Sequence, residues 1–317
     1  MIIHARKNQI EIAAPAKVNL FLELHARRDD GYHDIETVMS SVSIFDFLRF
    51  TRREDSNLML SIGLTKHGNL PREQDGIPCD KRNLIIRALE LVRATARKEL
   101  GPEYCETGIN VHLQKNIPSA AGLGGASSDA AAALVAGNRL WNLRWPITKL
   151  ASLASQLGSD ITFFLFEGTA ICRGRGEQVQ PIIVPVQIPI VVAKPPFSLS
   201  TAEVFGKVSV VDSPNDCAGL VQSVQRFDPK SLGDRMFNRL QQFVEPLSPA
   251  IAGLFDVLRF EFARLNCLGH QMSGSGSSYF GVFSNVRIAR QAARRLSARL
   301  PHVRIISSQT LIRIATS

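Results

Sequence analysis

One stretch near the middle of the chain decides the fold: KNIPSAAGLGGASSDA, residues 115–130. Residues 109–114 before it alternate between apolar and polar side chains, which predicts a strand, and the alanine-rich residues after it predict a helix. Gly122, Gly124 and Gly125 lie between the two elements and let the backbone adopt tight turns and approach a ligand closely. The N–H groups at the start of a helix attract anions. The stretch therefore predicts a strand, a loop and a helix that hold a polyphosphate.

The residues after the glycines exclude the best-known phosphate loop. A Walker A loop carries Lys and then Ser or Thr directly after its last glycine, whereas Gly125 is followed by Ala126, Ser127 and Ser128. A dinucleotide-binding loop is disfavoured too, because a third glycine at the required place and an acidic residue about 20 positions later are both missing. A glycine-rich turn that binds no ligand stays open from the spacing alone. Other segments of the chain must decide between the two.

The composition is that of an ordinary globular protein that is long enough for two domains. Of the 317 residues, 45% are hydrophobic and 21% are charged. The sequence contains no run of about 18 apolar residues, and its first residues lack the apolar middle of a secretion signal. Its five cysteines are widely separated without metal-ligand spacing, which indicates reduced thiols. We expect a cytoplasmic protein with no membrane partner.

The formal net charge of +9 invites a polyanionic partner, either a nucleic acid or a small molecule that carries phosphate. Much of the excess lies on one expected helix, whose arginines are Arg287, Arg290, Arg294, Arg295 and Arg299. No aromatic residues interleave with them, which favours a solvent-exposed basic face over an RNA-binding surface. We therefore expect no nucleic-acid partner.

Several other elements follow from local pattern. Strands are expected at residues 16–24 and 34–50, and the apolar run Ile161–Phe166 is expected to be a strand as well. Residues 65–82 combine Gly and Pro with many charges, which indicates a surface loop.

Strands and helices are interspersed without a regular parallel repeat, so we predict an α+β fold. Prolines between residues 181 and 196 indicate a domain boundary near residue 185. The predicted domains are residues 1–185, which contain the glycine loop, and residues 186–317.

Two further segments stand in a recognisable order around the glycine loop. The first is PAKVNL at residues 15–20 with DGYH at residues 30–33, and the second is MSGSGSS at residues 272–278. Together the three segments resemble the GHMP kinases, a family named for galactokinase and the homoserine, mevalonate and phosphomevalonate kinases. Shorter matches at 157–160, 200–202 and 238–240 extend the resemblance over most of the chain.

The resemblance implies a two-domain GHMP kinase fold. The N-terminal domain would be like domain 2 of ribosomal protein S5 and would bind ATP, and the C-terminal domain would be ferredoxin-like. The activity implied is transfer of the γ-phosphoryl group of ATP to an alcohol.

Carried over by position, Asp160 would be the general base and Lys17 its electrostatic partner. A carboxylate can accept the hydroxyl proton, and an ammonium keeps that carboxylate ionised and stabilises charge that develops on the phosphate oxygens. From spacing alone, Asp160 could equally be a turn residue and Lys17 a solvated strand lysine.

The resemblance also assigns the nucleotide site. Mg²⁺ would bridge the phosphate oxygens, although its protein ligands stay unknown, because Ser127 or Ser128 could supply a hydroxyl or could only cap the helix. The residues expected to hold the ATP phosphates are Pro118, Ser119, Ala120, Ala121, Gly122, Leu123, Gly124, Gly125, Ala126, Ser127 and Ser128.

For the acceptor, the resemblance is strongest to the member of the family that acts on a small-molecule cytidine diphosphate ester. Tyr32 and Phe205 would stack on the cytosine, and His33 would form hydrogen bonds with it. Asn19 and Thr201 would hold the rest of the acceptor. From the residues alone, Phe205 could instead be a core residue and His33 a surface histidine.

The sequence departs from the family pattern in the loop, where many members carry more glycine at the positions of Ser119, Ala120 and Ala121 and where glycine is frequent at Ala126. It departs again at Gln241, where an acidic residue is common. Two alternatives remain: another kinase of the family, acting on mevalonate or homoserine, or a basic RNA-binding protein. The aromatic residues for a base favour the cytidine ester. We expect a monomer or a weak homodimer.

Overall fold

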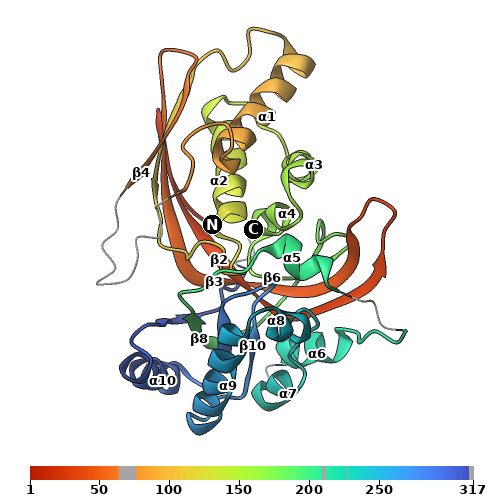
Figure 1. Cartoon of the computed structure of the whole chain (residues 1–317). Helices are drawn as coiled ribbons and strands as arrows, with labels where there is room; N and C mark the ends of the chain where they lie inside the picture. Colours follow the sequence, from red (N-terminus) through yellow and green to blue (C-terminus); the bar gives the residue numbers. More distant parts are fainter. Residues whose placement is uncertain (64–75, 209–211, 227, 314–317) are drawn as a thin grey trace. The chain divides into compact units, whose positions relative to one another are not determined.

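The computed structural model describes residues 1–63, 76–208, 212–226 and 228–313 (Figure 1). Most of the predicted surface loop at 65–82 lies outside these residues. The chain forms two compact units that interleave along the sequence. The first takes residues 1–16, 44–119 and 124–166, and the second takes residues 17–43, 120–123 and 167–317. The division predicted near residue 185 stays a prediction.

Two long strands, β2 (Gln9–Arg27) and β3 (His33–Arg52), contribute residues to both units. They confirm the extended structure expected at 16–24 and 34–50. The other elements of the first unit are β1 (Ile2–Arg6), β4 (Leu58–Gly63), α1 (Leu84–Leu100), β5 (Ile109–Gln114), α2 (Gly125–Leu140), α3 (Ile147–Leu157) and α4 (Ser159–Phe166).

The first unit is built on strands with helices on one side. Within it, β1 pairs antiparallel with β2, β5 pairs antiparallel with β3, and β4 pairs parallel with β5. Along β5, Ile109, Val111 and Leu113 are buried while the residues between them are exposed, as the alternation predicted. Figure 1 shows α1 to α4 gathered on one side of these strands.

Local signals set the ends of these helices. The Asn83 side chain accepts a hydrogen bond from the backbone N–H of Ile85 and caps α1. Pro146 precedes α3 and Gly158 ends it. Helix start and stop signals that are visible in the sequence therefore set these ends.

The strand expected at Ile161–Phe166 was wrong, because these residues form helix α4. Its apolar side chains have high strand propensity, but an unbroken apolar run carries no period that separates a strand from a buried helix. Ile161, Phe163 and Phe164 are all buried, and α4 packs against α2 and α3. Burial on every side thus overrode the local preference.

The second unit contains the remaining elements. They are β6 (Thr169–Arg173), β7 (Gln178–Ile182), β8 (Pro189–Lys194), α5 (Thr201–Gly206), α6 (Ala218–Arg226), α7 (Pro229–Asp234), β9 (Phe237–Asn238), α8 (Gln241–Leu247), α9 (Pro249–Arg264), β10 (Gly269–Met272), β11 (Tyr279–Val282), α10 (Val286–Arg299) and β12 (Arg304–Gln309).

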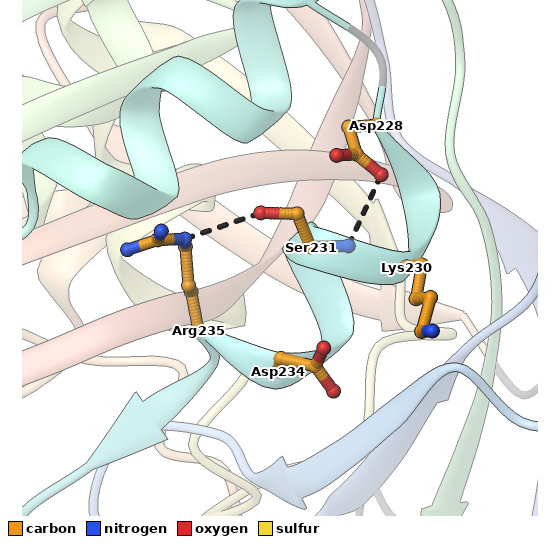
Figure 2. A pocket seen from close by; sticks show the side chains of 5 residues that line it. All are labelled: Asp228, Lys230, Ser231, Asp234 and Arg235. Carbon is orange, nitrogen blue, oxygen red and sulfur yellow. Dashed lines mark hydrogen bonds between the residues drawn. The ribbon is translucent and has the colours of Figure 1, made fainter.

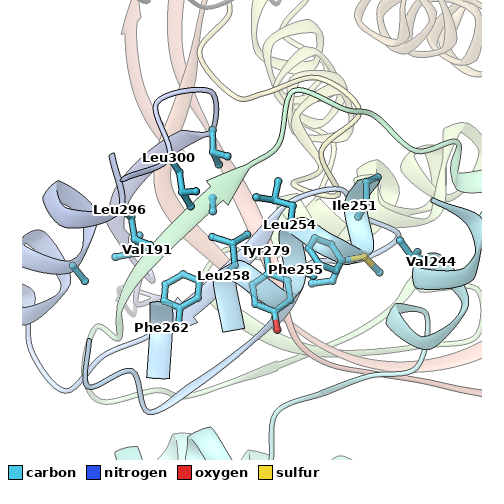
Figure 3. Packing of buried hydrophobic residues seen from close by; sticks show 14 of the residues in the cluster. Val191, Val244, Ile251, Leu254, Phe255, Leu258, Phe262, Tyr279, Leu296 and Leu300 are labelled. Atoms are coloured by element: carbon cyan, nitrogen blue, oxygen red, sulfur yellow. The ribbon is translucent and has the colours of Figure 1, made fainter. Parts of the chain in front are cut away.

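Strands β8, β10, β11 and β12 form one antiparallel sheet in the order β10-β11-β8-β12. One strand, a helical segment, two strands, a helix and a last strand follow along the chain, which is the ferredoxin-like arrangement predicted for the C-terminal domain. Helices α9 and α10 bury their apolar sides in the same core as this sheet (Figure 3). Phe255, Phe262 and Tyr279 lie at its centre, and each such side chain contributes about 1.5–3 kcal/mol on burial. The exposed face of α10 carries the arginines that the sequence placed there.

The rest of the second unit lies along β2 and β3. β6 pairs with β3, β7 with β6, and β9 with β2 at Phe21 and Leu22. These pairings place the segments around Lys17, His33 and Asn238 within one unit.

Candidate active site

The predicted strand, loop and helix are confirmed. Helix α2 starts at Gly125, and Gly124 precedes it in the left-handed conformation with φ of 70°. Neither Ser127 nor Ser128 caps the helix, because its cap residue is Gly124 and forms no side-chain hydrogen bond. The Ser128 hydroxyl is buried and has no hydrogen-bond partner in the described part of the chain. A buried hydroxyl without a partner among the described residues therefore lies at the first turn of α2.

Lys17 and Asn19 lie side by side on β2, because residues two positions apart share a face of a strand. The Lys17 ammonium donates to Asn19 Oδ1 at 2.5 Å, and Asn19 Nδ2 donates to Thr37 Oγ1 at 2.9 Å. The Lys17 side chain is only 4% exposed. Its backbone N–H donates to the carbonyl of Leu123 at 2.9 Å, which ties the strand to the middle of the glycine loop.

The segment at residues 272–278 lies against the same loop residues. Ser273 Oγ donates to the Gly122 carbonyl at 3.0 Å, and the Ser278 N–H donates to the Ala121 carbonyl at 3.1 Å. A Cβ atom on Gly122, where φ is +72°, would overlap the Ser273 carbonyl oxygen, so only glycine fits there. A Cβ on Gly274 would lie 3.0 Å from Lys17 Nζ.

Three segments far apart in the sequence thus meet in the second unit: residues 17–20 of the PAKVNL strand, residues 121–123 of the glycine loop and the segment at 272–278. Two side chains of the 238–241 segment hold the third of these in place. Asn238 Nδ2 donates to the carbonyls of Met272 and Gly274, and the Gln241 side-chain oxygen accepts the N–H of Met272. An amide oxygen accepts this hydrogen bond as a carboxylate would, which explains how Gln241 can replace an acidic residue.

Two of the predicted acceptor residues also meet. The ring centres of His33 and Phe205 are 6.0 Å apart. Burial, with a smaller contribution from Arg27, lowers the pKa of His33 below its ordinary value of 6.5, so the imidazole is neutral at pH 7 and can donate or accept a hydrogen bond. Thr201 Oγ1 lies 2.9 Å from Ser275 Oγ.

Tyr32 is 55% exposed, and one face of its ring is covered by the Arg175 guanidinium, 5.3 Å from the ring centre. Sequence reasoning did not single out Arg175, because the contact depends on how the turn between β6 and β7 meets the turn before β3. An aromatic side chain that is more than half exposed has surface on which an aromatic ligand could stack.

Asp160 lies in the first turn of α4, where the helix dipole stabilises a carboxylate. It belongs to the first compact unit and Lys17 to the second. Their predicted pairing stays a prediction.

A buried charge cluster in the first unit was not expected. Lys115 Nζ donates to Asp46 Oδ2 and, at 2.9 Å, to Asp129 Oδ2, and all three side chains are nearly inaccessible. Burial and the nearby Asp46 raise the pKa of Asp129 to about 7, although Lys115 opposes the shift. The alternation of the strands contained the signal, since Lys115 continues the inward positions of Ile109, Val111 and Leu113.

Figure 2 shows a pocket elsewhere in the second unit, lined by Asp228, Lys230, Ser231, Asp234 and Arg235. Its polar groups serve the short helix α7, since Asp228 accepts the N–H of Ser231 and Arg235 donates to Ser231 Oγ. None of the predicted site residues lines it.

Metal-binding clusters and membrane-spanning helices are both absent from the described residues. No cluster of three or more His, Cys, Asp or Glu side chains could hold a metal ion there. None of the helices in the described ranges has both the length and the apolar character needed to cross a membrane.

Comparison with known proteins matches two family descriptions to this chain. Residues 83–168 match "GHMP kinases N terminal domain", and residues 220–302 match "GHMP kinases C terminal".

Among similar proteins, two are named 4-diphosphocytidyl-2-C-methyl-D-erythritol kinase. The one from Pelotomaculum thermopropionicum is 36% identical over 90% of this chain and 93% of its own length. The one from Alkaliphilus metalliredigens is 32% identical over 95% of this chain and 97% of its own length.

Among solved structures, one titled 4-(cytidine 5'-diphospho)-2C-methyl-D-erythritol kinase matches with a TM-score of 0.73 and 31% identity, over 95% of this chain and 98% of that one. A homoserine kinase from Cytophaga hutchinsonii matches with a TM-score of 0.71 and 17% identity, over 98% and 97%, which is a likeness of fold alone.

Proposed function

Because the chain belongs to the GHMP kinase family, we propose that it phosphorylates a hydroxyl of 4-diphosphocytidyl-2-C-methyl-D-erythritol with ATP, in the non-mevalonate route to isoprenoid precursors. The family and the α+β GHMP kinase fold predicted from the sequence are confirmed. The choice of acceptor follows the relatives that share about a third of their residues with this chain over nearly its whole length.

The observation that carries the proposal is the meeting of three motifs around Lys17. The buried Lys17 ammonium lies beside Gly274. The backbone N–H of Lys17 donates a hydrogen bond to the carbonyl of Leu123 in the glycine loop. A buried ammonium in a water-poor site stabilises phosphate charge far more strongly than one in bulk water. This arrangement supports Lys17 as the electrostatic partner in phosphoryl transfer.

Asp160 is proposed as the general base, which accepts the proton of the acceptor hydroxyl as the oxygen attacks the γ-phosphorus. Phosphoryl transfer asks for positioning and charge neutralisation more than for covalent chemistry by the protein, so one carboxylate and one ammonium suffice for these roles.

ATP is proposed to bind with its phosphates along residues 118–128. The free N–H groups at the first turn of α2 and the glycines before it suit an anion. The Ser128 hydroxyl, which has no protein partner in the ranges that the structure describes, would supply one oxygen ligand to Mg²⁺, and Ser127 is the second candidate. When bound, that ion would neutralise phosphate charge.

On the acceptor side, Tyr32 and Phe205 are proposed to stack on the cytosine, with neutral His33 bonded to its polar edge. The contact between His33 and Phe205 and the exposed face of Tyr32 support this assignment. Asn19 and Thr201 are proposed to hold the remainder of the acceptor.

The proposal is tested by incubating the protein with ATP, Mg²⁺ and the cytidine diphosphate ester. We expect ADP and a singly phosphorylated ester in equal amounts. Asp160→Asn should lower kcat by about 10²- to 10⁴-fold, the usual contribution of a general base, and leave ATP binding nearly unchanged. Asp234→Asn, in the pocket of Figure 2, is the matched control and should keep full activity. Full turnover by Asp160→Asn would remove the assigned base.

The stacking role is tested separately with Tyr32→Ala. Loss of one stacking partner should weaken acceptor binding by about 1–3 kcal/mol, measured as KM for the ester, with the KM for ATP unchanged. Tyr104→Ala is the control, because Tyr104 is also exposed but lies in the other unit. An equal rise of both KM values in Tyr32→Ala would contradict the assignment.

A further inference from the structure

Asp46, Lys115 and Asp129 place three charged groups inside the first unit, with side chains 0%, 5% and 4% exposed. Burial costs several kcal/mol per ion, and two carboxylates facing one ammonium leave a formal charge of −1. Well-packed hydrophobic side chains at these positions would often make the fold more stable. A role other than stability therefore has to account for the cluster.

The hydrogen bonds of Asp46 show what the cluster holds on one side. While Oδ2 accepts the Lys115 ammonium, Oδ1 accepts the backbone N–H groups of Asn116 at 2.6 Å and Ile117 at 2.8 Å. The Asn116 side chain adds a bond to the carbonyl of Phe45. The point where the chain leaves β5 and enters the glycine loop is thus fixed to β3.

On the other side, Lys115 reaches the helix that leaves the loop. Its ammonium donates to Asp129, in the second turn of α2. A Cβ atom on Gly125 would lie 2.8 Å from Lys115 Nζ, so the ammonium lies directly against the first residue of the helix. The helix dipole disfavours a cation at this end, and the two carboxylates hold it there.

We propose that Asp46, Lys115 and Asp129 are positioning residues for the nucleotide: they fix the entry and the exit of the glycine loop relative to each other before ATP binds. The inference rests on the proposed function, since ATP is the ligand of that loop. None of the three touches the reacting atoms. Because they order the loop before ATP binds, the entropy cost of ordering it does not weaken ATP binding.

The experiment compares Lys115→Met with Asp46→Asn. Methionine matches the length of lysine without its charge or hydrogen bonds, and we expect KM for ATP to rise by about tenfold while KM for the acceptor stays within about twofold. Asparagine keeps one oxygen acceptor where two are in use, so a smaller rise of about threefold is expected. If Lys115→Met does not fold, Asp46→Asn carries the test.

Leu89→Ala is the control for lost stability, because Leu89 is fully buried on α1 of the same unit. It should lower the melting temperature and leave KM for ATP unchanged. Equal effects of Leu89→Ala and Lys115→Met on ATP would overturn the inference, as would an unchanged KM in both cluster variants.

Hydrogen exchange separates this inference from the proposed function. Amides of residues 116–128 should exchange faster in the cluster variants than in Leu89→Ala, with or without ATP. If the wild-type protein binds no nucleotide, the proposed function fails. The positioning role is then judged by exchange alone, and unchanged protection of these amides would overturn it.

Discussion

Two buried carboxylates, Glu23 in the second compact unit and Asp129 in the first, are paired in opposite ways. In the second unit, Glu23 is wholly buried and accepts two hydrogen bonds from Arg239, at 2.7 and 2.6 Å, and further bonds from the N–H groups of Leu24 and Asn215. In the first unit, Asp129 shares one ammonium with Asp46, and its Oδ1 has no partner in the described structure.

The pKa values follow this difference. Burial alone would raise the pKa of Glu23, but the bonds from Arg239, Leu24 and Asn215 outweigh it and lower the pKa below 4.5. For Asp129, burial dominates and the like charge of Asp46 adds to it. The fully paired Glu23 thus stabilises the fold. The incompletely paired Asp129 lowers the stability of the fold, and we attribute its presence to the positioning of the glycine loop.

The largest effect is expected from Glu23→Gln, which leaves the mostly buried Arg239 guanidinium without its counter-charge. The free energy of unfolding at pH 7 should fall by about 3 kcal/mol, measured by urea denaturation. Because the folded pKa of Glu23 is lowered, its contribution is present above pH 4.5 and is lost as the pH falls through the lowered pKa, so the variant should approach the wild type in acid.

Glu36→Gln is the matched control, because Glu36 also pairs with an arginine and bonds the N–H of Cys217. Its partner Arg173 is 46% exposed and can be solvated, so the loss should be only about 1 kcal/mol. Equal losses in both variants would show that burial of the arginine does not matter.

Asp129→Asn should act in the opposite direction. A carboxyl with a raised folded pKa loses stability as the pH rises from its unfolded value of 3.8 toward about 7, so wild-type stability is reduced at pH 8. The asparagine variant escapes this loss and should be more stable than the wild type by about 1 kcal/mol at pH 8, and no more stable at pH 4. The stability of each protein is measured at both pH values. An advantage of Asp129→Asn over the wild type that is smaller at pH 8 than at pH 4 would contradict this prediction.

The smallest effect is expected at Ala120, an exposed loop residue in the left-handed region with φ of 47°. Ala120→Gly relieves about 1–2 kcal/mol of strain but adds freedom to the unfolded chain, so thermal unfolding should show a gain of about 0.5 kcal/mol. Ala126→Gly is the control, because Ala126 lies in α2, where glycine should cost about 1 kcal/mol. A loss of stability in Ala120→Gly would show that the left-handed turn is not strained.

Local signals predicted much of the fold. The cap at Asn83, the proline before α3 and the alternation of β5 each act within a few residues, so the sequence alone was enough. Helix α4 was missed because its apolar residues have no distinguishing period, and only packing against α2 and α3 decides its form.

The site residues that belong to sequence motifs were predictable, whereas residues that reach the site only through a tertiary contact were missed. The motifs led to Lys17, Asn19 and residues 121–123 of the glycine loop, which the structure brings together in one unit. The contact of Arg175 with Tyr32 joins two turns that are far apart in the sequence. A local sequence pattern covers only neighbouring residues and cannot predict such a contact. Lys115 could have been found, since a charged residue at an inward strand position is itself a signal.

If the protein is a kinase whose acceptor carries a cytidine group, it should discriminate sharply among acceptor alcohols. Formation of ADP is followed with a panel of alcohols that share the methylerythritol part with and without the cytidine diphosphate, together with mevalonate and homoserine. We expect kcat/KM at least about 100-fold higher for the cytidine ester, since stacking contributes about 1–3 kcal/mol and hydrogen bonds to the polar edge of the base add to it. Equal turnover of acceptors that lack the base, or preference for mevalonate or homoserine, would contradict this expectation.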